Sequence, residues 1–151
     1  PGEVAVDQGP IPLGKANVMV EGSDLTIISW SGQVMRCQMA LAALAEAGIS
    51  AELIDLRTVS PWDKEAVLAS VTKTGRALVV HEAVRHFGPG AEIAATINEE
   101  LFGQLKAPVK RLGGAYCAVP FAKVPLPSGG YTMDHGAGLF VVSPAGAPAA
   151  Y

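Results

Sequence analysis

The sequence predicts an α/β domain, a three-layer α/β/α sandwich with a mostly parallel sheet. Apolar runs of strand length alternate with segments whose apolar residues recur at helical spacing, and glycine or proline separates most of them. The stretch from Leu25 to Asp63 holds a strand, a helix, a second strand and a further helix start, which makes a complete βαβ unit. Right-handed crossovers of such units place helices on both faces of an open sheet.

The first half of the chain supplies the elements of that unit. Residues 16–21 can form a short strand, and residues 25–31 are almost entirely apolar, as expected of a strand buried on both faces. A helix is predicted from Gly32 to Gly48, because one stripe of this segment is apolar and glycine readily takes the left-handed conformation that ends a helix. Residues 49–56 are then the second strand of the unit.

The second half continues the alternation. Ser60 can cap free N–H groups, Pro61 suits the first helical position and Asp63 suits the positive helix end, so a helix is predicted to start there and to end at Gly75. The elements expected next are a strand over 77–82, a helix that begins at 88–90 and ends at 103, and a strand over 109–112.

Composition divides the chain into three parts. Residues 1–14 are rich in proline and glycine and are expected to be a linker from a missing N-terminal domain. Residues 15–125 are expected to be the folded domain. Residues 126–151 are expected to be an irregular Gly/Pro-rich tail, in which only 139–142 can form a strand.

Composition also limits the partners. The chain of 151 residues suits one domain, and its 50% apolar and 17% charged residues indicate that part of the surface meets another domain or subunit. A net charge of −3 without a basic stripe argues against nucleic acid. No apolar run approaches the ~20 residues of a membrane helix, and no signal peptide is visible. Cys37 and Cys117 fit no metal or redox spacing, so reduced thiols and a cytoplasmic location are predicted.

A first candidate site is an anion site at the start of the first helix. Ser31, Gly32 and Gln33 follow a strand end, where free N–H groups can hold a phosphate or carboxylate. The segment lacks a G-x-G-x-x-G fingerprint and a P-loop lysine. The alternative is that Gly32 only allows close packing between helix and strand.

A second candidate is the segment that follows the predicted strand over 77–82. It concentrates charged and aromatic side chains, namely His81, Glu82, Arg85, His86 and Phe87. Such density invites an acid/base interpretation, but no nucleophile paired with a base and no third orienting group can be identified. An interface with another domain explains the same composition and is the favoured interpretation.

A third candidate is the pair that ends the strand over 49–56. Asp55 can accept backbone N–H bonds, and Arg57 can reach a carboxylate of a neighbouring chain. The alternative is a local surface pair worth about 0–1 kcal/mol. No catalytic, cofactor-binding or metal-binding set is therefore predicted in this chain.

A series of short motifs lies in order along residues 10–125. They are Pro12-Leu13-Gly14-Lys15-Ala16, Ile54-Asp55-Leu56-Arg57-Thr58, Ser60-Pro61, Thr74-Gly75-Arg76, His81-Glu82-Ala83, Phe87-Gly88-Pro89-Gly90-Ala91-Glu92-Ile93 and Ala107-Pro108-Val109. In combination they resemble the C-terminal, transketolase-type domain of the β subunit of a thiamine-diphosphate-dependent 2-oxoacid dehydrogenase component, of the pyruvate, branched-chain 2-oxoacid or acetoin dehydrogenase type.

The resemblance implies a role in assembly. In this family thiamine diphosphate and Mg²⁺ lie between an α chain and the N-terminal domain of the β chain, so no cofactor is expected on this domain alone. The parent carries out oxidative decarboxylation of a 2-oxoacid with acyl transfer to lipoyl, and this fragment alone is expected to be inactive. The resemblance implies that the domain contacts the α subunit and a second β subunit of a heterotetramer, and that it offers a docking surface to the acyltransferase core.

Two departures from the family pattern affect this reading. Related β chains often carry an acidic residue just before the Ala-Pro pair, where a basic domain of the acyltransferase docks, and this chain has Lys106. A lysine would repel basic side chains, which argues against docking by that route. The segment after Leu126-Pro127 also lacks the helical period of the family.

Two other functions remain open from the sequence. One is the C-terminal domain of another thiamine-diphosphate enzyme, of the transketolase or 1-deoxyxylulose-5-phosphate synthase type. The other is an independent module that binds an anion or small ligand.

Overall fold

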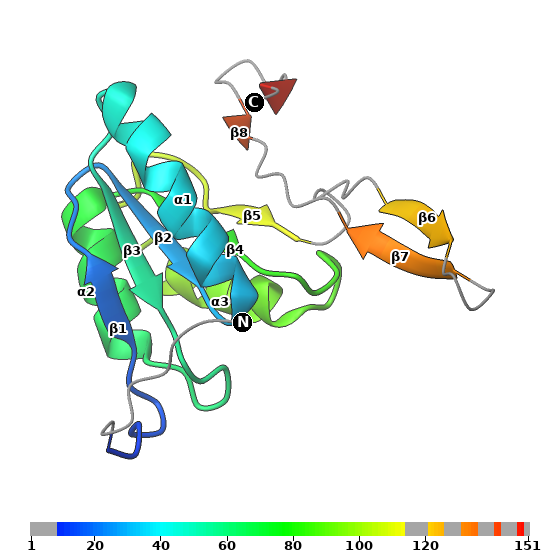
Figure 1. Cartoon of the computed structure of the whole chain (residues 1–151). Coiled ribbons are helices and arrows are strands. Elements are labelled where there is room, and N and C mark those ends of the chain that lie inside the picture. Colours follow the sequence, from blue (N-terminus) through cyan, green and yellow to red (C-terminus); the bar gives the residue numbers. More distant parts are fainter. Residues whose placement is uncertain (1–8, 114–120, 126–130, 136–140, 143–147, 150–151) are drawn as a thin grey trace.

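A computed structural model describes residues 9–113, 121–125, 131–135, 141–142 and 148–149 (Figure 1). Its main feature is a five-stranded sheet of order β1-β3-β2-β4-β5. The strands are β1 (Asn17–Val20), β2 (Leu25–Ser29), β3 (Ala51–Asp55), β4 (Ala77–Val80) and β5 (Lys110–Leu112). Only β1 runs antiparallel to its neighbour, so the sheet is mostly parallel, as predicted.

Helices cover both faces of this sheet. Helix α1 (Gly32–Glu46) lies in front of it, while α2 (Lys64–Thr74) and α3 (Pro89–Glu100) lie behind it (Figure 1). The predicted three-layer α/β/α architecture is thereby confirmed. The parallel strands end at one common edge, and the loops after β2, β3 and β4 leave the sheet there.

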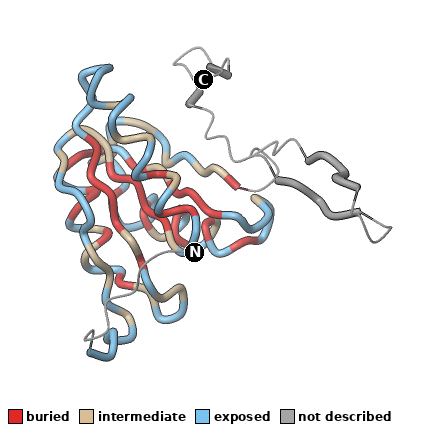
Figure 2. Tube along the Cα trace, in the orientation of Figure 1, coloured by how far each residue is buried: buried red, intermediate tan, exposed pale blue. Residues whose placement is uncertain are grey.

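The core forms two layers because alternate strand residues face opposite sides of the sheet. In β2, Ile27 belongs to the apolar cluster under α1, while its neighbour Ile28 belongs to the cluster under α2 and α3. Both are buried, as the red tube over the central strands shows (Figure 2). Burial of each such side chain stabilises the fold by about 1.5–3 kcal/mol.

The start of α2 differs from the sequence prediction. The helix begins at Lys64, and its cap is Asp63 instead of Ser60. Asp63 Oδ1 accepts a hydrogen bond from the Ala66 N–H at 3.2 Å, and Oδ2 accepts one from the Ala16 N–H at 3.0 Å. The two carboxylate oxygens of Asp63 accept hydrogen bonds from two backbone donors, and their negative charge suits the positive helix end. A serine hydroxyl carries no such charge. The predicted end of the helix is confirmed by Gly75, whose φ is 72°.

The C-terminal part contains more strands than the sequence predicted. Strands β6 (Phe121–Pro125) and β7 (Tyr131–His135) form an antiparallel pair, and β8 (Val141–Val142) pairs with β9 (Pro148–Ala149). The sequence predicted one strand in the tail, over 139–142, and therefore missed β6, β7 and β9. The residues between β6 and β7 have the length and the glycine content of a hairpin loop, a signal that the frequent prolines obscured. Residues 1–8 of the predicted linker and Cys117 lie outside the described residues.

Candidate functional site

The fold joins two of the candidates that the sequence presented separately. Gln33, at the start of α1, donates a hydrogen bond from Nε2 to Glu82 Oε1 at 2.9 Å. Trp30, at the end of β2, stacks on His81 with ring centroids 5.1 Å apart and planes 9° apart. The predicted anion segment and the His81 segment thus form one site at the carboxyl edge of the sheet. We call residues 81–88, which connect β4 to α3, the His81 loop.

His81 is the buried anchor of this loop. Its side chain is 1% exposed, and neither ring nitrogen makes a hydrogen bond within the described part of the chain. A Cβ on Gly90 would lie 2.4 Å from Nε2, and one on Gly88 would lie 3.2 Å from Cε1. Burial, and secondarily the positive charge of Arg111, lower the pKa of His81 below its usual value. The imidazole is therefore a neutral packing group at neutral pH.

The rest of the loop is braced against β5 and the residue that follows it. The His81 N–H donates to the Leu112 carbonyl at 3.0 Å, and Arg111 Nη1 donates to the Arg85 carbonyl at 3.1 Å. A Cβ on Gly113 would lie 3.0 Å from the Ala83 carbonyl oxygen, so the backbones approach closely. These contacts fix the loop in place.

The braced loop presents apolar side chains to solvent. Phe87 is 103% exposed and Val84 is 65% exposed. Phe87 also has a φ of 59°, a left-handed conformation that is costly for a residue with a side chain. Glu82 and His86 are exposed beside them, and Arg85 is half-buried. A fixed, exposed aromatic side chain is typical of a protein contact surface.

The start of α1 already faces a carboxylate. Glu82 Oε1 lies 3.4 Å from the position that a Cβ on Gly32 would take, and it also accepts the Gln33 hydrogen bond. This negative charge offsets the positive helix end. Ser31, with a φ of 57°, makes no side-chain capping bond. An incoming anion would meet Glu82, which weighs against the anion site; that site stays an untested prediction.

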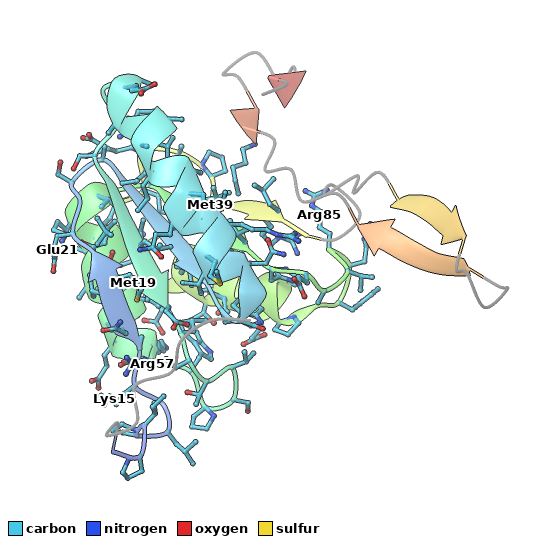
Figure 3. All side chains as sticks on the ribbon, in the orientation of Figure 1. Lys15, Met19, Glu21, Met39, Arg57 and Arg85 are labelled. Atoms are coloured by element: carbon cyan, nitrogen blue, oxygen red, sulfur yellow. The ribbon has the colours of Figure 1, made fainter. Side chains whose placement is uncertain are left out.

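Asp55 and Arg57 belong to a different surface. Asp55 Oδ1 accepts a hydrogen bond from the Arg57 N–H at 3.1 Å, and Arg57 is exposed with a φ of 57°. The neighbouring Thr58 Oγ1 accepts one from the Gly14 N–H at 2.9 Å, so the turn after β3 holds the N-terminal segment. Figure 3 shows Arg57 and Arg85 well apart on the molecule. The structure therefore does not bring this pair to the His81 loop.

Lys106 lies at the opposite edge of the sheet. Its Nζ donates to the Thr74 carbonyl at 3.2 Å, and its N–H donates to the Gly75 carbonyl at 2.8 Å. The ammonium thus sits at the negative end of α2, where a cation is favourable. The charge that sets this chain apart from the family pattern has a local structural partner.

The sequence analysis missed several residues of the site. Trp30 stacks on His81, Gly90 makes room for its ring, and Arg111 holds the loop from β5. The run Gly88-Pro89-Gly90 was the available signal, because glycines on both sides of a helix start indicate close backbone approach. Nothing in the sequence signalled Arg111, which reaches the loop only through the pairing of β4 with β5.

The described residues offer no clear metal site and no membrane span. Within them, His, Cys, Asp and Glu side chains nowhere gather in a group of three that could hold a metal ion. The helices of the same part of the chain are too short or too polar to cross a membrane.

Comparison with known proteins identifies the domain. The family model for the transketolase C-terminal domain matches residues 14–135. The mitochondrial 2-oxoisovalerate dehydrogenase subunit beta of Chaetomium thermophilum is 52% identical over 118 residues, which cover 73% of this chain and 25% of that protein. The pyruvate dehydrogenase E1 component subunit beta of Acholeplasma laidlawii is 43% identical over 121 residues, covering 80% of this chain and 37% of that protein.

A solved structure agrees with these matches. A split-gene transketolase, described as an inactive beta4 tetramer, aligns with a TM-score of 0.64 and 26% identity over 74% of this chain and 36% of its own. The chain spans only about a quarter to under two fifths of the length of the relatives named above. It belongs to the transketolase C-terminal domain family and is similar to the domain found in the β subunits of 2-oxoacid dehydrogenases.

Proposed function

We propose that this chain is the subunit-assembly domain of the thiamine-diphosphate-dependent component of a 2-oxoacid dehydrogenase complex. Its similarity to the β subunits of pyruvate and 2-oxoisovalerate dehydrogenases supports this role. The other enzymes considered, transketolase and 1-deoxyxylulose-5-phosphate synthase, are not favoured, because the curated relatives at 43–52% identity are dehydrogenase β subunits. Decarboxylation of the 2-oxoacid and acyl transfer to lipoyl then belong to the whole parent enzyme.

The observation that carries the proposal is Phe87 on its braced loop. A phenylalanine that is fully exposed gains about 1.5–3 kcal/mol when a partner buries it. The loop is already fixed by Arg111 and by the packing of His81, so little conformational entropy is lost on binding. The His81 loop is proposed as the contact with a neighbouring subunit, with Asp55 and Arg57 on a second contact surface.

The charge at the start of α1 bears on where the cofactor of the parent enzyme binds. The pyrophosphate of thiamine diphosphate with Mg²⁺ needs oxygen ligands for the metal and donors for the phosphates. The start of α1 is the phosphate site that the sequence offered as a candidate, and the negative charge of Glu82 lies beside it. We therefore propose that thiamine diphosphate and Mg²⁺ bind the parent outside this domain.

The proposed partners are an α subunit and a second β subunit. The similar split-gene transketolase is described as a tetramer, which supports association between subunits that carry such a domain. Docking of a basic acyltransferase domain at Lys106 is not favoured, because that ammonium already caps α2 and would repel it. The relatives include bacterial and mitochondrial proteins, and a cytoplasmic location is proposed for a bacterial parent.

Assembly of the parent enzyme tests this function. The β chain that carries this domain is co-expressed with its α chain, as wild type and as the Phe87→Ser variant. We expect the variant to dissociate at a concentration at least about tenfold higher, since 1.4 kcal/mol of lost burial is a factor of ten. Mass photometry across a dilution series measures the tetramer fraction, and 2-oxoacid decarboxylation follows activity.

Phe102→Ser is the matched control. Phe102 is 90% exposed but follows α3 at the opposite edge of the sheet, so its loss should leave the tetramer intact. An unchanged dilution curve for Phe87→Ser, or an equal effect of both variants, would overturn the assignment of the His81 loop as the subunit contact.

A further inference from the structure

The packing of His81 couples the protonation of one ring to the position of a loop. The ring is buried between the indole of Trp30 and the backbone of Gly88 and Gly90, where the His81 loop leaves β4 on its way to α3 (Figure 1). A Cβ on Gly90 would lie 2.6 Å from Cδ2 and 2.4 Å from Nε2, so the ring fills the space that the glycine leaves. The ring is therefore an anchor that holds the loop against the sheet.

The surroundings of this ring are unsuited to a positive charge. Nε2 faces the first turn of α3, which is the positive end of that helix. Neither ring nitrogen has a hydrogen-bond partner in the described part of the chain, so an imidazolium would bury two N–H groups without acceptors. The indole face of Trp30 favours a cation, but burial and the charge of Arg111 prevail and lower the pKa of His81.

No carboxylate among the described residues is paired with His81. Glu82 follows it in the chain but accepts the hydrogen bond from Gln33 at the start of α1, on the face of the sheet opposite α3. None of the ion pairs formed within the described residues includes His81. The charged and titratable groups of the elements around the ring are Arg111 on β5, Glu92 on α3 and, in the loop itself, Glu82, Arg85 and His86. The end of β2 and the start of α1, residues 29–33, contribute no charge.

The loop depends on this ring for its place. Among residues 81–88, His81 contributes the one fully buried side chain, while residues 82–84, 86 and 87 are exposed. A segment with few buried side chains opens at a lower free energy than the core strands. Opening also lets Phe87 leave its left-handed conformation, which has a φ of 59°. Departure of the ring can therefore release the loop while the sheet stays folded.

We infer that protonation of His81 opens the His81 loop, so that mild acid releases Phe87 from its fixed position. A proton from the solvent bonds to the unprotonated ring nitrogen, and the imidazolium leaves the space beside Gly90 for water. The open form binds the proton near the ordinary histidine pKa of about 6.5, whereas the closed form resists it. The ratio of open to closed loops therefore rises about tenfold for each pH unit below that value.

This inference rests on the proposed function for one consequence, namely that acid weakens the subunit contact made by the His81 loop. Opening of the loop itself needs no partner. It can be measured on the 151-residue chain in the absence of other subunits.

Trp30 reports the position of the ring. The chain has two tryptophans, so Trp62→Phe leaves Trp30 as the single indole emitter. Quenching of its fluorescence by acrylamide, a neutral probe, measures the access of solvent to the indole between pH 7.5 and pH 5. We expect the quenching constant to rise in a one-proton step whose midpoint lies below about pH 6.5. The far-ultraviolet circular dichroism should stay unchanged through this step, because the sheet and helices remain folded.

Substitution of the three histidines assigns the step. His81→Phe keeps a ring beside Trp30 that binds no proton, so it should abolish the step. His86→Gln, at an exposed position of the same loop, and His135→Gln should retain it. Gly90→Ala displaces the ring at every pH and should show the high quenching constant already at pH 7.5. A step that survives in His81→Phe, or equal protection of Trp30 down to pH 5, overturns the inference.

Nuclear magnetic resonance keeps the test independent of any His81 variant. With ¹³C at Cε1 of every histidine, the titration of each ring is followed in the wild-type chain. We expect the His81 ring to titrate below about pH 6.5, and the amide signals of residues 82–88 to shift with the same midpoint. The amide signals of β2 should not follow it. A His81 midpoint at or above that value, or loop amides that ignore it, overturns the inference.

The parent enzyme separates this switch from the proposed contact. Mass photometry of diluted tetramer at pH 7.5 and pH 5.5 should show easier dissociation in acid, and His81→Phe should remove that response. If Trp30 reports opening but the tetramer ignores both pH and Phe87→Ser, the switch stands and the assignment of the His81 loop as the subunit contact fails. If Phe87→Ser weakens the tetramer but Trp30 shows no step, the contact stands and the switch is overturned.

Discussion

At the scale of single residues, the environment of His81 shows how a segment rich in titratable side chains takes a packing role. The sequence places two histidines, a carboxylate and an arginine within one loop, a composition that suits acid/base chemistry. The fold buries one histidine against Trp30 and Gly90 and turns the other outward. A residue that looks titratable in the sequence thereby becomes a neutral core group, and the loop becomes a rigid support for Phe87.

Gly90→Ala should destabilise the domain by about 1–3 kcal/mol, because the added methyl carbon would overlap His81 Nε2 in a packed site. Urea unfolding measures the change. His81→Ala combined with Gly90→Ala should cost less than the sum of the single variants, since removing the ring relieves the overlap. Gly9→Ala, where a Cβ meets nothing within 4 Å, is the neutral control. Strict additivity of the two buried variants would contradict the close contact.

The lowered pKa of His81 predicts a loss of stability in mild acid. The unfolded state binds the proton near the ordinary histidine pKa of about 6.5, while the folded state binds it only at lower pH. The contribution of His81 is therefore fully present above about pH 6.5 and is lost as the pH falls toward the folded pKa, by up to about 1.4 kcal/mol per pH unit.

Urea unfolding at a series of pH values between 7.5 and 5 measures the free energy of unfolding at each pH. Its slope against pH should correspond to the uptake of about one proton on unfolding. His81→Phe should flatten it, whereas His86→Gln, at an exposed position, should not. A slope that persists unchanged in His81→Phe would assign the acid sensitivity to other groups.

At the scale of elements, the ends of the helices decide how segments distant in sequence are tied together. Asp63 caps α2 and also binds the Ala16 backbone, so one carboxylate joins the helix start to the segment before β1. At the other end of α2, Gly75 and Lys106 complete the last turn. The two ends of this helix thus hold the entry to the sheet and the approach to β5.

Asp63→Ala should reduce stability by more than the roughly 0.5–2 kcal/mol of a usual capping residue, because it leaves two backbone donors without their partner. Asp63→Asn keeps one acceptor oxygen and should fall between the wild type and Asp63→Ala. Thermal unfolding by circular dichroism gives the order of the three proteins. Glu65→Ala, an exposed acidic position in the same first turn, should change little, and an equal loss there would indicate a general charge effect.

At the scale of the whole molecule, the domain presents two surfaces suited to other chains. The carboxyl edge carries the His81 loop with the exposed Phe87, and the outer face of α1 exposes Met35 and Met39. These surfaces account for a composition that is half apolar and sparsely charged. The domain organisation expected from the sequence, with a linker over 1–14, a domain over 15–125 and a tail over 126–151, stays a proposal.

Much of the fold could be read from the sequence because its determinants are local. The apolar run of β2, the helical stripe of α1 and the left-handed Gly75 each signal their element without reference to the rest of the chain. The motifs along residues 10–125 also indicated the family correctly. Strands β6 and β7 were missed because proline and glycine outweighed the weaker pattern of a hairpin.

The sequence by itself determined the class of fold, the family and the residues that would gather at strand ends. Only the tertiary structure decided that Trp30 and His81 stack, that Glu82 occupies the start of α1, and that Phe87 stays exposed. The physical reason is distance along the chain. These contacts join residues about fifty positions apart or set a loop against a neighbouring strand. They exist only once β2 pairs with β4 and β4 pairs with β5, both in parallel. The local sequence pattern determines whether a segment forms a helix or a strand, and the strand order of the sheet determines which side chains come into contact.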